Sequence, residues 1–464
     1  MSDFYVSPLS DRYAGEEMRR LFSPQFKYST WRRLWVALAE SEQQLGLPIS
    51  DEQIQELKSH IDDINFDAVA TYEAELHHDV MAHIKAYGDL CPKAAPIIHL
   101  GSTSCYVTDN TDLIQIREAY RILTPKLLNV IEQLSEFAAR FSELPCLGFT
   151  HFQPAQLTTV GKRACLWLQD FVIDYHEMER SASQLRFLGA KGATGTQASF
   201  YALFEGDLDK LDQLDQLIAK KLEFNDLLTI SGQTYSRKQD IQALSALSSF
   251  AASVHKFAND IRLLSHLKEV QEGFGAKQVG SSAMPYKKNP MLSERLCSLS
   301  RFVITGTQNA HHTAATQWLE RTLDDSANRR LVIPEMFLTV DALLNILQRV
   351  IGSLTVNPEV IERRLRDELP FIATENILMH VVKKGGNRQE IHERLRQHSH
   401  AAAHRVHIEG KANDLFERLA ADSEFDIGDL DLDPSQFIGA SAHQVKRFLC
   451  EEVDPLFSSL GACK

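Results

Sequence analysis

The chain has 464 residues, of which 44% are apolar and 24% charged; this is typical of a globular enzyme, and the length exceeds that of one ordinary domain. Its formal net charge of −13, with no block of Lys and Arg to offset it, argues against nucleic acid or an anionic membrane as a partner. The N-terminal residues lack the charged-then-apolar pattern of a signal peptide, and no apolar run approaches the length of a bilayer span. We therefore expect a cytoplasmic protein that contacts no membrane.

Long helices are predicted along most of the chain. Apolar positions between Thr111 and Phe141 recur mostly at steps of three and four, which is the helical period. The stretch from Asp109 to Thr111 has the composition of a helix N-cap, and Pro125 predicts a kink or a break inside the helix.

Three further stretches contain neither Gly nor Pro: Lys162 to Leu188, Ser236 to Glu272 and Thr307 to Ile333. The second is long enough for a helix of about 50 Å. Strand-like alternation is scarce, so we expect an all-α fold. Helices of this length need a large core, which indicates a bundle, one that several subunits share.

The interruptions of this pattern are the candidate functional segments. They lie at 79–101, 148–161, 189–195 and 273–290. A connection as long as the last is more often a functional lid or a disordered segment than filler. A turn at 356–358 then leads to shorter helices.

The 273–290 segment has the composition of an anion-binding loop. Asn289 can cap a helix and Pro290 suits its first turn, so the loop is expected to lead into a helix N-terminus with free N–H groups. Lys287 and Lys288 add positive charge beside it. A solvated basic turn is the simpler alternative.

The seven cysteines are scattered, with no C-x-x-C pair and no His/Cys spacing typical of zinc. We expect reduced thiols and no metal. Neither common glycine motif for nucleotides, G-x-G-x-x-G or G-x-x-x-x-G-K-[ST], occurs, so we expect no cofactor.

The 280–290 loop, Gly-Ser-Ser-Ala-Met-Pro-Tyr-Lys-Lys-Asn-Pro, resembles the signature of the fumarase/aspartase superfamily, whose members eliminate fumarate from succinyl compounds. Its Ala283, Tyr286 and paired lysines are similar to the adenylosuccinate lyase family in particular. Other segments match in the same order along nearly the whole chain: His78–His83, His99–Ser104, Thr150–Gln156 and Arg321–Ser326.

The resemblance implies a β-elimination that releases fumarate from adenylosuccinate and from the related ribotide SAICAR. Such a reaction needs a base, an acid for the departing nitrogen, and cations that stabilise the carbanion. The resemblance assigns Ser281 as the base and His151 as the acid, with Glu294 pairing with His151. It also gives Lys287 and His78 supporting catalytic roles. The residue pattern alone leaves Ser282 open as the base, and both serines could be ordinary turn residues.

The substrate carries two carboxylates and a phosphate, for which arginine forks and hydroxyls are suitable partners. By resemblance the binding residues are Arg12, Tyr13, His77, Asp79, His99, Thr103, Ser104, Gln233, Asn289, Arg295, Arg321, Ser326 and Arg330. Two positions depart from the family pattern. His77 stands where an arginine is common, and Lys288 replaces the more usual arginine, which removes bidentate geometry.

The implied fold has an N-terminal helical domain (1–103), a central long-helix bundle (104–356) and a C-terminal helical domain (357–464). Four such subunits would form a homotetramer, with each active site drawn from three of them. Two alternatives remain open: another fumarate-releasing lyase such as argininosuccinate lyase, and a non-catalytic helical scaffold.

Overall fold

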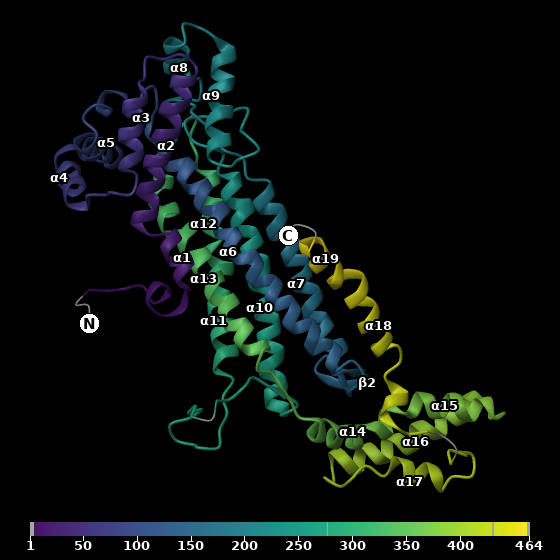
Figure 1. Ribbon diagram of the computed structural model, residues 1–464. Helices are drawn as coiled ribbons and strands as arrows, with labels where there is room; N and C mark the ends of the chain where they lie inside the picture. Colours follow the sequence, from purple (N-terminus) through teal and green to yellow (C-terminus); the bar gives the residue numbers. More distant parts are fainter. Residues whose placement is uncertain (1–3, 276, 429–430, 462–464) are drawn as a thin grey trace. The chain divides into compact units, whose positions relative to one another are not determined.

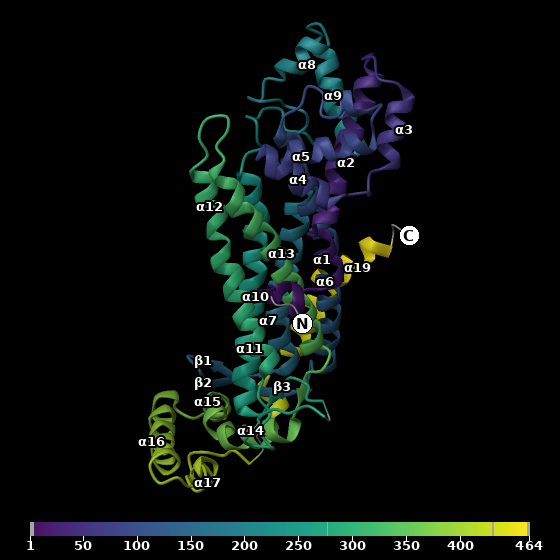
Figure 2. The same ribbon diagram turned by 90° about the vertical axis from the view of Figure 1, so that its left-hand side faces the viewer.

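The computed structural model describes residues 4–275, 277–428 and 431–461. The fold is almost entirely helical, which confirms the predicted all-α class (Figures 1 and 2). The chain forms two compact units: unit 1 comprises Met1–Leu128, Asp174–His255 and Ser298–Ile346, and unit 2 comprises Asn129–Ile173, Lys256–Cys297 and Leu347–Lys464. Because both units combine three stretches of chain, the division at residues 103 and 356 stays a prediction.

The unit boundaries fall inside five long helices: α6 (Ser104–Arg140), α7 (Val160–Ser183), α10 (Lys238–Leu267), α11 (Met291–Gly306) and α13 (Asp324–Ile351). Unit 1 also holds η1 (Leu9–Tyr13), α1 (Glu16–Leu21), α2 (Pro24–Gln44), α3 (Asp51–Ser59), α4 (Phe66–Leu76), α5 (Asp79–Leu90), η2 (Ala95–Ile97), α8 (Ala198–Leu203), α9 (Leu208–Lys221) and α12 (Gln308–Ala315). Unit 2 holds β1 (Pro145–Thr150), β2 (Gln153–Thr159), β3 (Val270–Gln271), β4 (Thr355–Val356), α14 (Pro358–Ile372), α15 (Thr374–Lys383), α16 (Arg388–His407), α17 (Leu415–Ala420), η3 (Pro434–Phe437), α18 (Ser441–Phe448), η4 (Leu449–Val453) and α19 (Asp454–Gly461).

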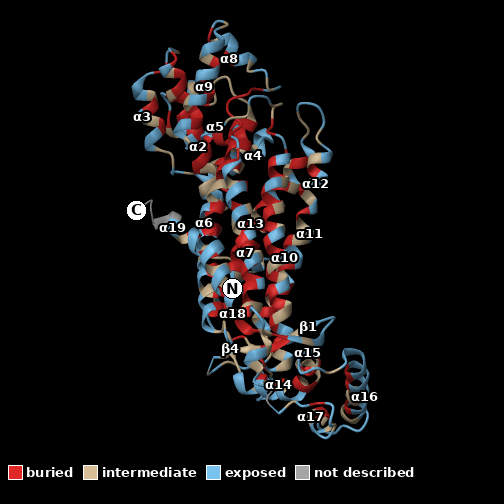
Figure 3. Ribbon diagram, turned by 90° about the vertical axis from the view of Figure 1, so that its right-hand side faces the viewer, coloured by how far each residue is buried: buried red, intermediate tan, exposed pale blue. Residues whose placement is uncertain are grey.

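The core of unit 1 lies where α6, α10 and α13 meet, and buried residues gather on their facing sides (Figure 3). The Tyr120 hydroxyl of α6 donates a hydrogen bond to the carbonyl of Ala243 on α10, at 2.7 Å. The Tyr120 ring stands edge-on to Phe337 of α13, with 5.4 Å between ring centroids. These contacts anchor the three helices whose ends carry most of the polar residues described below.

In unit 2, α7 and α10 are held together by Trp167. Its Nε1 donates a 2.7 Å hydrogen bond to Asp260, and its ring meets Phe257 edge-on. The shorter helices that follow the 356–358 turn were predicted, and their apolar residues form a separate cluster around Ile377 and Leu415.

Several local predictions are wrong. The helix predicted from Thr111 begins at Ser104, so Asp109 to Thr111 lie inside α6 and are buried there. The chain stays helical through Pro125, so the break predicted there is absent, while the alternative of a kink stays a prediction. The neighbouring Leu123 and Leu127 are completely buried, and Thr124 Oγ1 donates to the carbonyl of Tyr120.

The helix predicted over Thr307–Ile333 is interrupted between α12 and α13. Leu319 adopts a φ of 49°, and the amide of Gln233 donates to the carbonyl of Glu320 at 3.0 Å. The tertiary hydrogen bond therefore outweighs helix propensity there. The long helix predicted from Ser236 is confirmed as α10.

Among the described residues one helix, α13, is long and apolar enough to span a membrane by length and composition. The expectation that no such stretch exists was therefore too strict. In its most apolar window 72% is buried inside the fold, as in the core helix of a soluble protein.

Glu42 on α2 is fully buried, and neither carboxylate oxygen has a hydrogen-bond partner among the described residues. Burial raises its pKa to about 8, from an ordinary 4.5. Between those pH values the folded chain binds more protons than the unfolded chain, so this group lowers stability as the pH rises through that window. We expect Glu42→Met to raise the free energy of unfolding by about 2–4 kcal/mol at pH 8, and by much less at pH 5.

Chemical denaturation at both pH values measures this effect. Glu40 on the same helix is the matched control, because hydrogen bonds from Lys221 and Lys58 outweigh burial and hold its pKa below the ordinary value. Glu40→Met should give no gain at pH 8. Equal effects of the two substitutions would contradict the account.

Candidate active site

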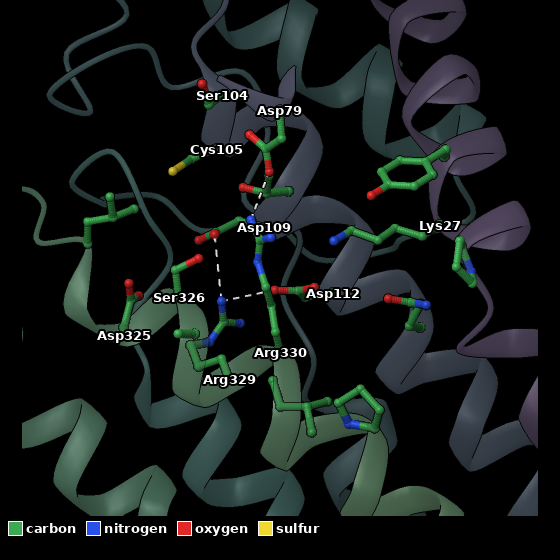
Figure 4. A pocket seen from close by; sticks show the side chains of 18 of the residues that line it. Lys27, Asp79, Ser104, Cys105, Asp109, Asp112, Asp325, Ser326, Arg329 and Arg330 are labelled. Carbon is green, nitrogen blue, oxygen red and sulfur yellow. Dashed lines mark hydrogen bonds and ion pairs between the residues drawn. The ribbon is translucent and has the colours of Figure 1, made fainter. Parts of the chain in front are cut away.

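A cavity of about 750 Å³ in unit 1 is lined mainly by polar and charged side chains (Figure 4). Seven of the predicted site residues line it: His77, His78, Asp79, Ser104, Arg321, Ser326 and Arg330. They come from the α4–α5 turn, from the first turn of α6, and from the segment that leads into α13 together with the first turns of that helix; these are far apart in the sequence. The order of motifs along the chain thus predicted a real spatial cluster.

His78 reaches the cavity with a defined orientation. Its Nδ1 accepts the amide hydrogen of Met81 at 3.3 Å and thereby caps α5. In the neutral imidazole this leaves the proton on Nε2, which lies 3.5 Å from the Ser104 hydroxyl. His78 can therefore donate a hydrogen bond into the cavity.

Asp79 and Arg330 form an ion pair across the cavity at 2.8 Å (Figure 4). Burial favours the neutral acid, but the hydrogen bond from Arg330 and that from the Val80 amide outweigh it and hold the pKa of Asp79 below its usual value. Asp79 is therefore ionised at neutral pH. In this structure it pairs with Arg330, a side chain that could otherwise bind an anionic ligand.

Beneath these residues lies a buried ion-pair network that the sequence analysis missed. Arg237 binds Asp109 and Asp325, and Arg329 binds Asp112 at 2.9 Å and Asp240 at 2.8 Å. Both guanidinium groups are almost completely buried. Asp325 in turn binds Arg321 at 3.0 Å, so the network fixes the position of a predicted binding residue.

Five other predicted residues of unit 1 do not line the cavity: Arg12, Tyr13, His99, Thr103 and Gln233. His99 is largely buried, and its Nδ1 accepts a 2.9 Å hydrogen bond from Trp35. Burial, with a smaller effect from His78, lowers its pKa to about 4, so it is neutral. Gln233 accepts from the Cys105 thiol and donates to the carbonyl of Ala193. These two residues support the cavity wall.

In unit 2, His151 lies at the tip of the β1–β2 hairpin, which the sequence analysis did not predict. The turn between Thr150 and Gln153 contains His151 and Phe152, with φ values of 51° and 57°. This is the geometry of a type I′ turn, which favours Asn and Gly over such residues. Two non-glycine residues at positive φ store strain, a feature that clusters at functional sites.

The 273–290 loop is held by one hydrogen bond at its start and by another within the loop itself. The Gly273 amide donates to Ser353 Oγ, and Asn289 Nδ2 donates to the carbonyl of Gly280 at 2.8 Å. Asn289 therefore does not cap α11 as predicted. Glu272 does so, because its carboxylate accepts hydrogen bonds from the amides of Leu292 and Ser293 and from the Ser293 hydroxyl. A protein carboxylate thus takes the place at this helix end that was predicted for a ligand anion.

Within the loop, Ser281 and Ser282 differ. Ser281 Oγ accepts hydrogen bonds from the amides of Ala283 and Met284, at 3.3 and 3.1 Å. No hydrogen bond from the described residues reaches Ser282 Oγ, and that side chain is exposed. Lys287 and Glu294 are also exposed, and Arg295 is half-buried. Among the described residues no hydrogen bond joins Glu294 to His151 in this single chain.

The comparisons with known proteins agree with the motifs. The model of the Lyase family matches residues 11–305, and that of the adenylosuccinate lyase C-terminus matches residues 370–448. The adenylosuccinate lyase of Saccharomyces cerevisiae is 52% identical over 461 residues, covering 97% of this chain and 95% of that protein. That of Schizosaccharomyces pombe is 50% identical, covering 98% and 96%. The chain belongs to the adenylosuccinate lyase family.

The chain is therefore a lyase. Its fold is similar to that of two solved structures. The 3-carboxy-cis,cis-muconate lactonizing enzyme from Pseudomonas putida gives a TM-score of 0.83 at 22% identity, covering 96% of this chain and 98% of that one. A fumarate lyase from Mesorhizobium sp. BNC1 gives 0.81 at 22% identity. At this identity the likeness shows the fold alone.

Among the residues that the structure describes, no three or more His, Cys, Asp or Glu side chains lie close enough together to hold a metal ion. The six cysteines among the described residues form no disulfide, and five are buried. Burial raises the pKa of the Cys105 thiol, which lines the cavity, to about 12. Cys105 is therefore a neutral wall residue.

Proposed function

We propose that this chain cleaves adenylosuccinate to AMP and fumarate, and SAICAR to AICAR and fumarate, by β-elimination. The observation that carries the proposal is identity of 48–52% over nearly the full chain to three adenylosuccinate lyases. The polar cavity and the 280–290 loop supply the chemistry that such a reaction needs. A β-elimination carried out by these residues requires neither a metal nor a cofactor.

In this proposal, Ser281 removes the proton from the carbon next to a carboxylate. A serine hydroxyl is a weak base and must be activated. The amides of Ala283 and Met284 already donate to Ser281 Oγ, and hydrogen bonds to an oxygen favour its ionised form. Among the described residues no donor reaches Ser282 Oγ, which favours Ser281 as the base. Lys287 would add positive charge once the loop closes over the substrate.

His151 donates a proton to the departing N6 nitrogen. Its place at the tip of a strained, exposed hairpin suits a group that reaches into a site formed with other segments. Glu294 favours the imidazolium through pairing across subunits. The remaining predicted residues, including Asn289 within the loop and Arg295 on α11 after it, bind the carboxylates and the phosphate.

We further propose that the active site is assembled in a homotetramer, with the cavity, the hairpin and the loop contributed by three different subunits. In unit 2, Leu166 and Ile173 project from one face of α7, and their side chains are 50% and 59% exposed. Apolar residues seven positions apart on a long helix are typical of an unfilled helix–helix contact. A cytoplasmic location fits the reduced cysteines.

A substrate panel tests the proposed activity. Purified protein is expected to release fumarate from adenylosuccinate and SAICAR, which is followed by ultraviolet absorbance, and to leave argininosuccinate, aspartate and malate unchanged. Turnover of argininosuccinate in place of adenylosuccinate would move the chain to a sister activity. No turnover of any of the five would favour the non-catalytic scaffold.

A further inference from the structure

One cation of the cavity differs from the others in its pairing. Five cationic side chains line the cavity: Lys27, Arg237, Arg321, Arg329 and Arg330. Each of the four arginines has a carboxylate oxygen within 3.0 Å. Within the part of the chain that the structure describes, Lys27 has no carboxylate at ion-pair distance. The sequence analysis did not single out this residue.

Lys27 extends from α2 with its amine directed into the cavity, toward the side chain of Arg330 (Figure 4). The ammonium lies 5.5 Å from the ring centroids of both Tyr28 and Trp31, which restrict its position. Burial lowers its pKa; the charges of Arg330 and Arg329 act in the same direction, and those of Asp112 and Asp79 oppose them. A partly desolvated ammonium without an ion pair is unfavourable until a ligand supplies the negative charge.

We propose that Lys27 binds the phosphate of the nucleotide portion of the substrate, beside Arg330, and this inference rests on the proposed function. A phosphomonoester carries up to two negative charges and can engage more than one cation. Lysine binds phosphate as a compact point charge, which complements the planar guanidinium of Arg330. Arg330 is half-exposed, and its positive charge is already paired with the Asp79 carboxylate. Arg330 alone therefore offers the phosphate little uncompensated positive charge.

The charge of the phosphate separates it from the two carboxylates as the ligand of Lys27. A carboxylate is matched by one arginine fork, whereas a phosphomonoester carries up to about two negative charges and can engage a further cation. Lys27 is directed toward Arg330, whose own charge is shared with Asp79, so the two cations together suit the phosphate.

Calorimetric titration with AMP and with adenosine isolates the phosphate contribution. Lys27→Met should weaken AMP binding by about 10- to 100-fold, the range expected for losing one charge-assisted hydrogen bond, while adenosine binding is unchanged. Lys27→Arg should restore most of the AMP affinity. Lys85 also lies over a tyrosine ring, at 5.4 Å from Tyr72, but outside the cavity, so Lys85→Met is the matched control and should bind AMP normally.

Thermal unfolding without ligand separates binding from a structural role. Because Lys27 forms no ion pair with the residues that the structure describes, Lys27→Met should unfold at the same or a higher temperature than the natural chain. A lower unfolding temperature with unchanged AMP affinity would overturn the assignment, as would an equal loss for AMP and adenosine. Lost inhibition by fumarate with AMP affinity intact would place a carboxylate at Lys27 and also overturn it. If the natural chain binds AMP through Lys27 but does not cleave adenylosuccinate, the proposed function fails and the phosphate assignment stands.

Discussion

Ser281→Ala is expected to lower kcat for adenylosuccinate by about 10²- to 10⁴-fold, the range typical of removing a general base. The Ser281 hydroxyl accepts hydrogen bonds from two backbone amides. The substitution therefore removes the proposed base and also two hydrogen bonds that shape the loop. Steady-state kinetics of fumarate release measure the effect. The far-ultraviolet circular dichroism spectrum should stay helical, because the loop lies outside the helical cores.

Ser282→Ala is the matched control, since it removes the same hydroxyl from the next residue. We expect its kcat to stay within about threefold of the natural value, as for a residue with no role in the chemical step. A large loss for Ser282→Ala with normal activity for Ser281→Ala would reverse the assignment. His151→Ala should lose activity to a similar degree as Ser281→Ala.

Arg329→Met is expected to destabilise unit 1 by about 3–5 kcal/mol. The guanidinium of Arg329 binds Asp112 and Asp240 and donates to the Tyr235 hydroxyl, and all of these groups are largely buried. Removing the cation leaves the carboxylates without compensation in a medium that solvates them poorly. Urea unfolding, compared at equal protein concentration, measures the loss.

Arg20→Met controls for the loss of an arginine as such. Arg20 pairs with Glu16 on α1, where both side chains are mostly exposed, so its removal should cost no more than about 1 kcal/mol. If Arg329→Met were as mild as Arg20→Met, the buried network would not be the source of stability beneath the cavity.

The helical class and much of the cavity could be predicted from the sequence. Uninterrupted stretches such as Ser236–Glu272 carry their own helical signal, and the motifs around His78, Ser104 and Arg321 are local strings of residues. Local patterns were sufficient wherever the structure follows from neighbours along the chain.

The errors occur where tertiary contacts override local preference. Asn110 was expected to cap a helix, yet its side chain lies inside α6 and hydrogen-bonds the backbone of Leu188 and Gly189. The cap of α11 comes from Glu272, nineteen residues before Met291. Such partners are distant in sequence, so a single sequence gives no sign of them.

The cavity residues that were missed follow the same rule. Lys27 lies in a helix whose sequence contains no motif that points to a binding site. Only the fold places it in the same cavity as Arg330. Arg237 and Arg329 resemble surface charges in the sequence, because burial cannot be read from residue type alone.

The most direct test of the account mixes two inactive variants, Ser281→Ala and His151→Ala, after reversible dissociation into subunits. If the base and the acid of one site come from different subunits, about one quarter of the sites in a random equimolar mixture regain both groups. The predicted result is recovery of up to about a quarter of the natural kcat from two variants that are each inactive. Mixed tetramers that stay as inactive as either variant would contradict a site shared between subunits.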